Sequence, residues 1–340
     1  MPTPTIRPRD RVIAALALGA AAVYLHVATH LAHVDSDLAP IWWSARALLE
    51  GMNPYVVVGP GGSLYHWPYV QLYPLPAILL LTPFTPLETG PASMLFIGIS
   101  GACLAYAVAR DGYARFPIFL SAGFIWAVNR AQWSPLLTAA TLIPALGFLL
   151  VVKPTIGLAL FLYRPTLIAA VGAIVLLLAS LAVWPGWPAA WYPLLVPHAP
   201  NMIAPISVLG GPLLLLALLR WRRAEARLLL ALALIPQTPL PYETVVLFLV
   251  TTTLAEASIL AALTWVFSEL LVAAVRPDMP TPEKRAVAMR LMVLTVYLPT
   301  LVMLLRKPNE GDTPELIRAV RERLSRLRRL GSVERAAQPL

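Results

Sequence analysis

The near absence of charge over long apolar stretches constrains this chain more than any other feature. Between residues 12 and 305 only 25 of 294 residues are charged, whereas about a quarter of the residues of a soluble domain carry charge. Hydrophobic residues make up 59% of the chain, and a membrane-crossing helix needs about 20 of them in succession. The sequence therefore excludes a soluble globule, a disordered chain and a fibrous protein. It predicts an all-α integral membrane protein, a polytopic bundle of about 10–12 transmembrane or partial helices.

The basic residues predict how the chain is oriented. Arginines precede the first apolar run, cluster between Arg220 and Arg227, and recur in the tail from Arg306, whereas residues 33–72 contain a single basic residue, Arg46. Because loops rich in lysine and arginine stay in the cytoplasm, both termini are expected there, with residues 33–72 as the first extracytoplasmic loop. This placement assigns the net charge of +9 to topology in the cell membrane, so no nucleic-acid partner is expected.

Two regions are expected along the chain. Residues 1–305 form the transmembrane domain, and residues 306–340 form a basic cytoplasmic tail. In the tail, Thr313, Pro314 and Glu315 resemble the start of a helix, after which leucines recur at helical spacing with arginines on the other face. The tail is thus expected to contain an amphipathic helix that lies on an anionic membrane surface.

The first outer loop contains the candidate chemistry. Apolar residues recur at helical spacing from about Leu38 to Glu50, which predicts a helix too short to span a membrane and lying along its surface. Two carboxylates, Asp35 and Asp37, precede this helix. From spacing alone, either residue could cap the helix, or the pair could supply a base that removes a proton from a hydroxyl group.

The segment from Asp37 to Tyr55, DLAPIWWSARALLEGMNPY, resembles the first-loop signature of the polyprenyl-phosphate-mannose-dependent mannosyltransferase family, which has the GT-C fold. Further similarities follow in chain order at residues 73–76 (YPLP), 129–133 (NRAQW), 153–155 (KPT) and 239–243 (PLPYE). Leu38 and Ile41 stand where the family usually has aromatic residues. The turn around Gln132 lacks the family's glycine.

The resemblance implies a membrane enzyme without a cofactor or metal. It would transfer a sugar, with mannose expected, from a polyprenyl-phosphate donor to a lipid or glycan acceptor on the extracytoplasmic face, inverting the anomeric centre. Asp37 would act as the general base, with Asp35 as the second catalytic candidate. A cation must stabilise the leaving phosphate, and Arg46, Arg130 and Lys153 are the candidates. The other expected substrate-binding residues are Trp42, Tyr55, His66, Gln132, Tyr242 and Glu243. Tryptophan and tyrosine suit sugar rings, but a membrane interface enriches the same residues.

Two other hypotheses remain open at this stage. His26, His30 and His33 recur on one face of the first helix at metal-ligand spacing, which is compatible with a membrane metal- or haem-binding redox subunit. A non-catalytic lipid carrier with the same fold is the third possibility, and acidic residues at membrane depth such as Glu243 would suit it.

Overall fold

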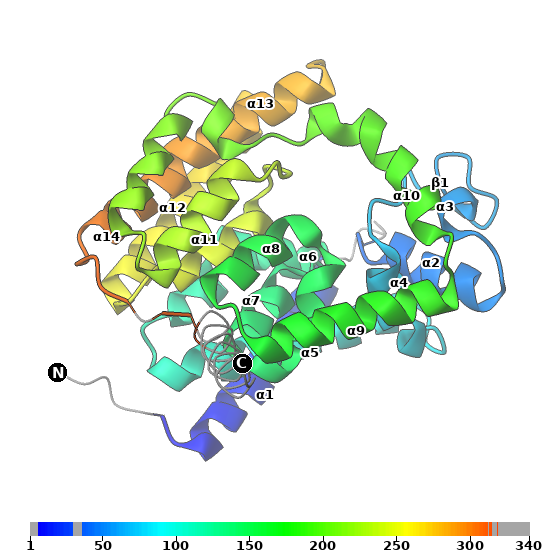
Figure 1. Ribbon diagram of the computed structural model, residues 1–340, viewed down its shortest axis with the longest axis horizontal. Coiled ribbons are helices and arrows are strands. Elements are labelled where there is room, and N and C mark those ends of the chain that lie inside the picture. Colours follow the sequence, from blue (N-terminus) through cyan, green and yellow to red (C-terminus); the bar gives the residue numbers. More distant parts are fainter. Residues whose placement is uncertain (1–5, 30–35, 312, 315–317, 319–340) are drawn as a thin grey trace, which may run out of the picture.

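The computed structural model describes residues 6–29, 36–311, 313–314 and 318. The protein is mostly helical, which confirms the predicted all-α class. In Figure 1, α2, α3, α4 and β1 lie on one side of the molecule and α11 to α14 on the other, with α6, α7 and α8 between them. The tail helix predicted from Thr313 onward falls almost entirely outside the described residues.

The first half of the chain contains these elements: α1 (Pro8–Thr29), α2 (Ala39–Leu49), α3 (Pro54–Val57), β1 (Val58–Gly59), β2 (Tyr65–His66), α4 (Leu75–Leu81), η1 (Thr82–Phe84), α5 (Thr89–Val108), η2 (Ala109–Asp111), η3 (Phe116–Leu120), α6 (Ala122–Asn129), α7 (Ser134–Leu142), η4 (Pro144–Val152) and α8 (Pro154–Tyr163). The short strands β1 and β2 pair in parallel. Helix α2 confirms that a helix covers residues 38–50, to within one residue at each end; its position along the membrane surface stays a prediction.

The second half contains these elements: α9 (Leu167–Val183), α10 (Trp187–Leu195), η5 (Val196–Asn201), η6 (Pro205–Ser207), η7 (Gly211–Arg220), α11 (Ala224–Leu234), η8 (Pro241–Leu249), α12 (Leu254–Ala274), α13 (Thr281–Met292), the π-helical segment η9 (Val293–Tyr297) and α14 (Leu298–Leu305). The other η elements are 3₁₀ helices. Because α13, η9 and α14 follow one another directly, they form one long helical segment.

Four helical segments among the described residues are long and apolar enough to cross a membrane: Pro8–Thr29, Thr89–Asp111, Leu254–Ala274 and Thr281–Leu305. A fifth span results if Leu167–Val183 and Trp187–Asn201, bent by 106° at their junction, are counted together. The remaining helices are shorter, so the count of 10–12 transmembrane or partial helices stays a prediction.

Prolines explain why so many of these helices are short. Many of the helices carry proline in their first two positions, among them α2, α4, α7, α8 and α14. At that position the missing N–H costs nothing, because the first amides of a helix have no intrahelical partner. Prolines therefore mark many of the helix starts and divide the apolar chain into short segments.

Small residues allow α1 and α5 to approach each other closely. A Cβ atom on Gly19 of α1 would lie 2.9 Å from the carbonyl oxygen of Gly98 and 3.0 Å from the Cβ of Ala102, both in α5. Between lipid-exposed helices, where water provides no hydrophobic driving force, such close packing is a main source of association. The α1–α5 pair thus depends on a glycine face.

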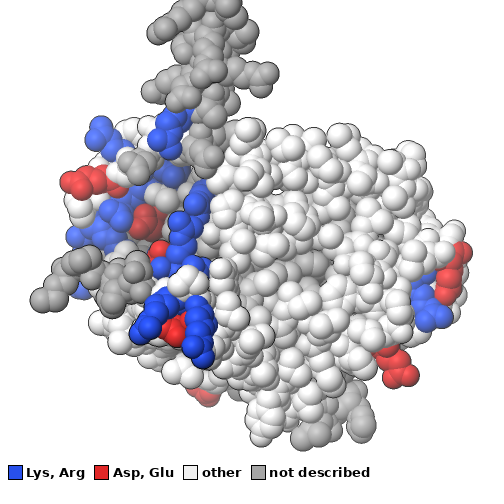
Figure 2. All heavy atoms as spheres, turned by 90° about the horizontal axis from the view of Figure 1, so that it is seen from below, with Lys and Arg blue, Asp and Glu red and all other residues white. Residues whose placement is uncertain are grey.

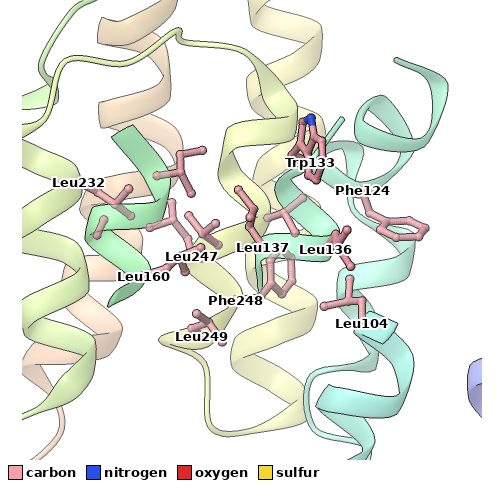
Figure 3. Close-up of a cluster of buried hydrophobic side chains, with 14 of the residues drawn as sticks. Leu104, Phe124, Trp133, Leu136, Leu137, Leu160, Leu232, Leu247, Phe248 and Leu249 are labelled. Carbon is pink, nitrogen blue, oxygen red and sulfur yellow. The ribbon is translucent and has the colours of Figure 1, made fainter. Parts of the chain in front are cut away.

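The core lies around α7 and η8. Every residue of η8 is buried, as are all residues of α7 before Leu142. Figure 3 shows Leu136 and Leu137 of α7 close to Phe248 of η8, with Leu104 of α5 and Leu160 of α8 at the sides. This packing fixes the N-terminal ends of α7 and η8, which carry Ser134 and Glu243.

Basic segments that are distant in sequence meet at one end of the molecule. Figure 2 shows lysine and arginine gathered there beside a broad surface without charge. Arg220 donates to the backbone oxygens of Leu305 and Lys307, Arg115 donates to that of Thr251, and Lys307 pairs with Glu256. We call this region the basic end. It unites the arginine cluster at 220–227 with the start of the tail, which were predicted to share the cytoplasmic side.

We predict that Gly19→Val destabilises the protein by about 1–3 kcal/mol, because the larger side chain forces α1 away from α5. The matched control is Gly90→Val in the first turn of α5, where an added Cβ meets no atom within 4 Å. Thermal unfolding of both purified variants in detergent is the measurement. Equal unfolding temperatures for the two would contradict close α1–α5 packing.

Candidate active site

Asp37 lies beside the first turn of α2 but does not cap it. The N-cap residue is Leu38, and no side chain accepts a hydrogen bond from the helix start. The capping role considered for Asp37 is therefore wrong. Instead, the backbone N–H of Asp37 donates to the carbonyl oxygen of Arg130 at 3.1 Å. The buried Ser36 side chain pairs with Ser93 of α5 at 2.9 Å between hydroxyl oxygens, so the segment before α2 is fixed on both sides.

The carboxylate of Asp37 faces the turn between α6 and α7. The side-chain amide of Gln132 donates to Oδ2 at 2.6 Å, and a guanidinium nitrogen of Arg130 lies 3.9 Å from Oδ1. Gln132 is itself buried, and the hydroxyl of Tyr73 donates to its Oε1 at 3.4 Å. The Asp37 side chain keeps 26% of its surface exposed. It is thus held by one amide while remaining open to a reactant.

The turn at residues 129–132 explains how Gln132 and Arg130 reach Asp37. The N–H of Gln132 donates to the oxygen of Ala127 at 2.8 Å and that of Ala131 donates to the oxygen of Val128 at 3.2 Å. Ala131 has a φ of +51°. These are the bonds and the left-handed residue of a Schellman motif, in which glycine is usual. Ala131 thus adopts a conformation in which glycine is usual.

Lys153 and Glu243 form a second, more deeply buried part of the site. The Lys153 Nζ lies 2.7 Å from Oε1 of Glu243, and only 16% and 2% of the two side chains are exposed. Ser134 donates to the other carboxylate oxygen at 3.5 Å, and Nζ lies 5.2 Å from the ring centre of Tyr242. Lys153 is close enough for its charge to act on Asp37. The two parts therefore belong to one polar cluster.

Burial decides the protonation behaviour of Asp37. It raises the pKa of this carboxyl above the ordinary value, because the charged form loses hydration. The positive charge of Arg130, the hydrogen bond from Gln132 and the charge of Lys153 all oppose this rise. A carboxylate with a raised pKa is a stronger base than free aspartate, which suits proton removal from a hydroxyl group.

The structure brings together Asp37, Arg130, Gln132, Lys153, Tyr242 and Glu243 from the predicted residues. Arg46 instead pairs with Glu50 at 2.9 Å on the exposed face of α2, and the indole N–H of Trp42 donates to the oxygen of Phe84. His66 accepts from the backbone of Gly61 on the surface. Tyr55 borders the cluster, since its hydroxyl donates to the backbone oxygen of Tyr73. Asp35 lies outside the described residues.

Three polar side chains in or beside the cluster were not predicted from the sequence: Tyr73, Ser134 and Gln71. Gln71 is buried, donates to the oxygens of Pro40 and Ser44, and accepts from the N–H of Tyr73. It thereby ties α2 to the start of α4. Tyr73 lies in a resemblance segment and Ser134 directly follows one, so their position in the sequence could have indicated the site. For Gln71 the sequence offers only its polarity in an apolar chain.

The histidine face is only partly described. Nδ1 of His26 lies 2.8 Å from the backbone oxygen of Val128, while His30 and His33 fall outside the described residues. Within the described part of the chain, no group of three or more His, Cys, Asp or Glu residues could hold a metal ion.

Comparison of the chain with protein-family models, with curated proteins and with solved structures found no match.

We predict that residue 131 responds to substitution in the opposite way to an ordinary helical alanine. Ala131→Gly relieves the left-handed strain and keeps stability within about 1 kcal/mol of the parent or slightly above it, whereas Ala131→Val costs about 1–3 kcal/mol. At the exposed Ala145 in η4, glycine should destabilise instead. Thermal unfolding in detergent ranks the stabilities of these variants. If Ala131→Gly loses as much stability as Ala145→Gly, Ala131 does not have the left-handed conformation of this turn.

Proposed function

We propose that this protein is an inverting glycosyltransferase. It transfers a sugar, with mannose expected, from a polyprenyl-phosphate donor to a lipid or glycan acceptor at the extracytoplasmic face of the cell membrane. The observation that carries the proposal is the Asp37 carboxylate, which is free of a capping role, is held by Gln132 and faces Arg130. The resemblance of residues 37–55 to a first-loop signature supplies the reaction class.

The proposed reaction needs one base and no strong acid. Asp37 removes the proton from the acceptor hydroxyl while its oxygen attacks the anomeric carbon. The bond from that carbon to the phosphate oxygen breaks, and its electron pair leaves with the polyprenyl phosphate. Because a phosphate leaves as a weakly basic anion, electrostatic stabilisation can replace its protonation.

Arg130 is the cation best suited to the leaving phosphate. Its side chain is 43% exposed, and its one ion-pair contact among the described residues is the 3.9 Å approach to Asp37. Lys153 is already neutralised by Glu243 at 2.7 Å, and Arg46 by Glu50. A planar guanidinium can also donate two parallel hydrogen bonds to phosphate oxygens. We therefore assign phosphate binding to Arg130 and the positioning of the surrounding cluster to the Lys153–Glu243 pair.

The orientation follows from charge. If the basic end faces the cytoplasm, as lysine- and arginine-rich ends do, the outer loop that carries Asp37 belongs to the opposite side. A lipid-linked donor could then reach the site from the outer leaflet.

We predict that Asp37→Asn lowers the rate of sugar transfer by roughly 10²–10⁴-fold, the usual contribution of a general base. Asparagine keeps an oxygen that can accept from Gln132, so the fold should survive. The assay follows transfer from polyprenyl-phosphate mannose to added membrane acceptors by the purified protein in detergent. The matched control, Glu50→Gln at the exposed C-cap of α2, removes one carboxylate elsewhere in the same loop.

Three outcomes would contradict this assignment. Full activity of Asp37→Asn would show that Asp37 is not the base. Donor binding by the parent protein without any new glycosidic bond indicates a carrier. Loss of activity in a chelator such as EDTA, or a haem absorption band, favours the metal- or haem-binding alternative.

We predict a second effect on the pH dependence of kcat/KM. Its acid limb reports the pKa of the free enzyme's base, so it should lie above the ordinary aspartate value. Arg130→Gln removes a charge that lowers the pKa of Asp37; the pKa then rises, and the limb moves to higher pH. The control Arg276→Gln, on an exposed arginine paired with Asp278, should leave it in place. An unmoved limb in Arg130→Gln would mean that Asp37 is not the titrating base.

A further inference from the structure

A cavity of about 400 Å³ opens at the basic end, away from the Asp37 cluster. It lies where the junction of α8 and α9, the start of α11 and the chain after α14 meet, and Figure 1 shows the segment after α14 running toward the start of α9. Five arginines line it: Arg164, Arg222, Arg223, Arg227 and Arg318. A second, smaller cavity of about 220 Å³ shares Arg164 with it.

The charges around this cavity do not cancel. Among the described residues two carboxylates also line it, Glu225 and Glu310, so the positive charge of this described lining exceeds its negative charge by three. Glu225 is already paired with Arg223 at 2.9 Å, and the buried Nε of Arg223 has no hydrogen-bond partner in the described part of the chain. An anion that enters the cavity would thus meet guanidinium groups that no described carboxylate neutralises.

The arginines of the cavity divide into two kinds. Arg227 donates to the backbone oxygens of Leu162, Tyr163 and Arg222, so it covers the carbonyls at the end of α8 that would otherwise repel an anion. Arg164 uses one nitrogen, for the oxygen of Leu142 at 3.3 Å. The side chain of Arg222 lies over the Trp221 ring and makes no hydrogen bond or ion pair with described residues. Most side-chain donors of Arg164 and all of those of Arg222 are therefore not taken up by described residues and could bind a ligand.

The surroundings place this cavity at the edge of the apolar surface. Leu167 and Ile168 follow it at the start of α9 and are 51% and 60% exposed. Before Arg222, Leu218 and Leu219 of η7 and the exposed Trp221 present further apolar surface. Tryptophan beside a band of exposed leucines marks the level of lipid headgroups in a bilayer.

We propose that this cavity binds the phosphate of an anionic phospholipid from the leaflet at the basic end, with Arg164 and Arg222 as the main donors. The proposal does not rest on sugar transfer, because no residue of the Asp37 cluster takes part. It gives the basic end a lipid-binding role in addition to setting orientation.

The test is native mass spectrometry of the purified full-length protein in an uncharged detergent, titrated with phosphatidylglycerol or phosphatidylcholine. We expect the parent protein to retain phosphatidylglycerol preferentially. The double variant Arg164→Gln/Arg222→Gln should bind it roughly tenfold more weakly or worse, since charge-assisted hydrogen bonds are lost. The matched control Arg276→Gln/Arg290→Gln removes the same charge from exposed positions outside the cavity and should bind as the parent does.

A second arm separates the sources of phosphate. Inorganic phosphate is added without lipid, and thermal unfolding of the parent and the double variant is compared. Stabilisation of the parent alone by millimolar phosphate, together with no preference for phosphatidylglycerol, would replace the lipid with a soluble anion and overturn the proposal. Equal phosphatidylglycerol binding by the parent and the double variant would also overturn it.

Discussion

The constraint on which this structure depends is that polar groups in an apolar body must find partners within the protein. Buried hydroxyls meet it locally, as when Ser44, Ser100 and Thr138 donate to the carbonyl oxygen one turn earlier. The most deeply buried charges meet it across distant segments. Lys153 and Glu243, 90 residues apart, pair at 2.7 Å because leaving either one alone at this depth would cost several kcal/mol. This pair joins the start of α8 to the start of η8.

Asp37 meets the constraint only in part. One oxygen receives a strong hydrogen bond from Gln132, whereas the other has, among the described residues, only a guanidinium at 3.9 Å. The incomplete pairing follows from the turn at 129–132, because the left-handed Ala131 turns Gln132 inward and leaves the side chain of Arg130 half-exposed. The open oxygen is what a reaction at Asp37 would require.

Local features of this chain are predictable from its sequence, whereas its long-range contacts are not. Helix α2 was located to within one residue at each end because its apolar residues recur with the helical period. Capping by Asp37 was the simplest inference from spacing, and it is wrong because Gln132, 95 residues away, competes for the carboxylate. Spacing could not choose among Arg46, Arg130 and Lys153 either. The three cations differ in which carboxylate they pair with. Arg46 pairs with the nearby Glu50, whereas the carboxylates beside Arg130 and Lys153 come from distant segments. The resemblance segments did converge in space, except that Arg46 pairs with its own helix.

The charge balance of the Asp37 cluster bears on how donor binding and catalysis would be coupled. Arg130 and Lys153 face Asp37 and Glu243, so the cluster is neutral before a donor arrives. A donor phosphate bound at Arg130 would add negative charge near Asp37 and weaken the attraction that lowers its pKa. The pKa of Asp37 would then rise further, because a neighbouring anion disfavours a second negative charge. The base would thus become stronger when the donor is in place and would take the proton of the acceptor hydroxyl more readily.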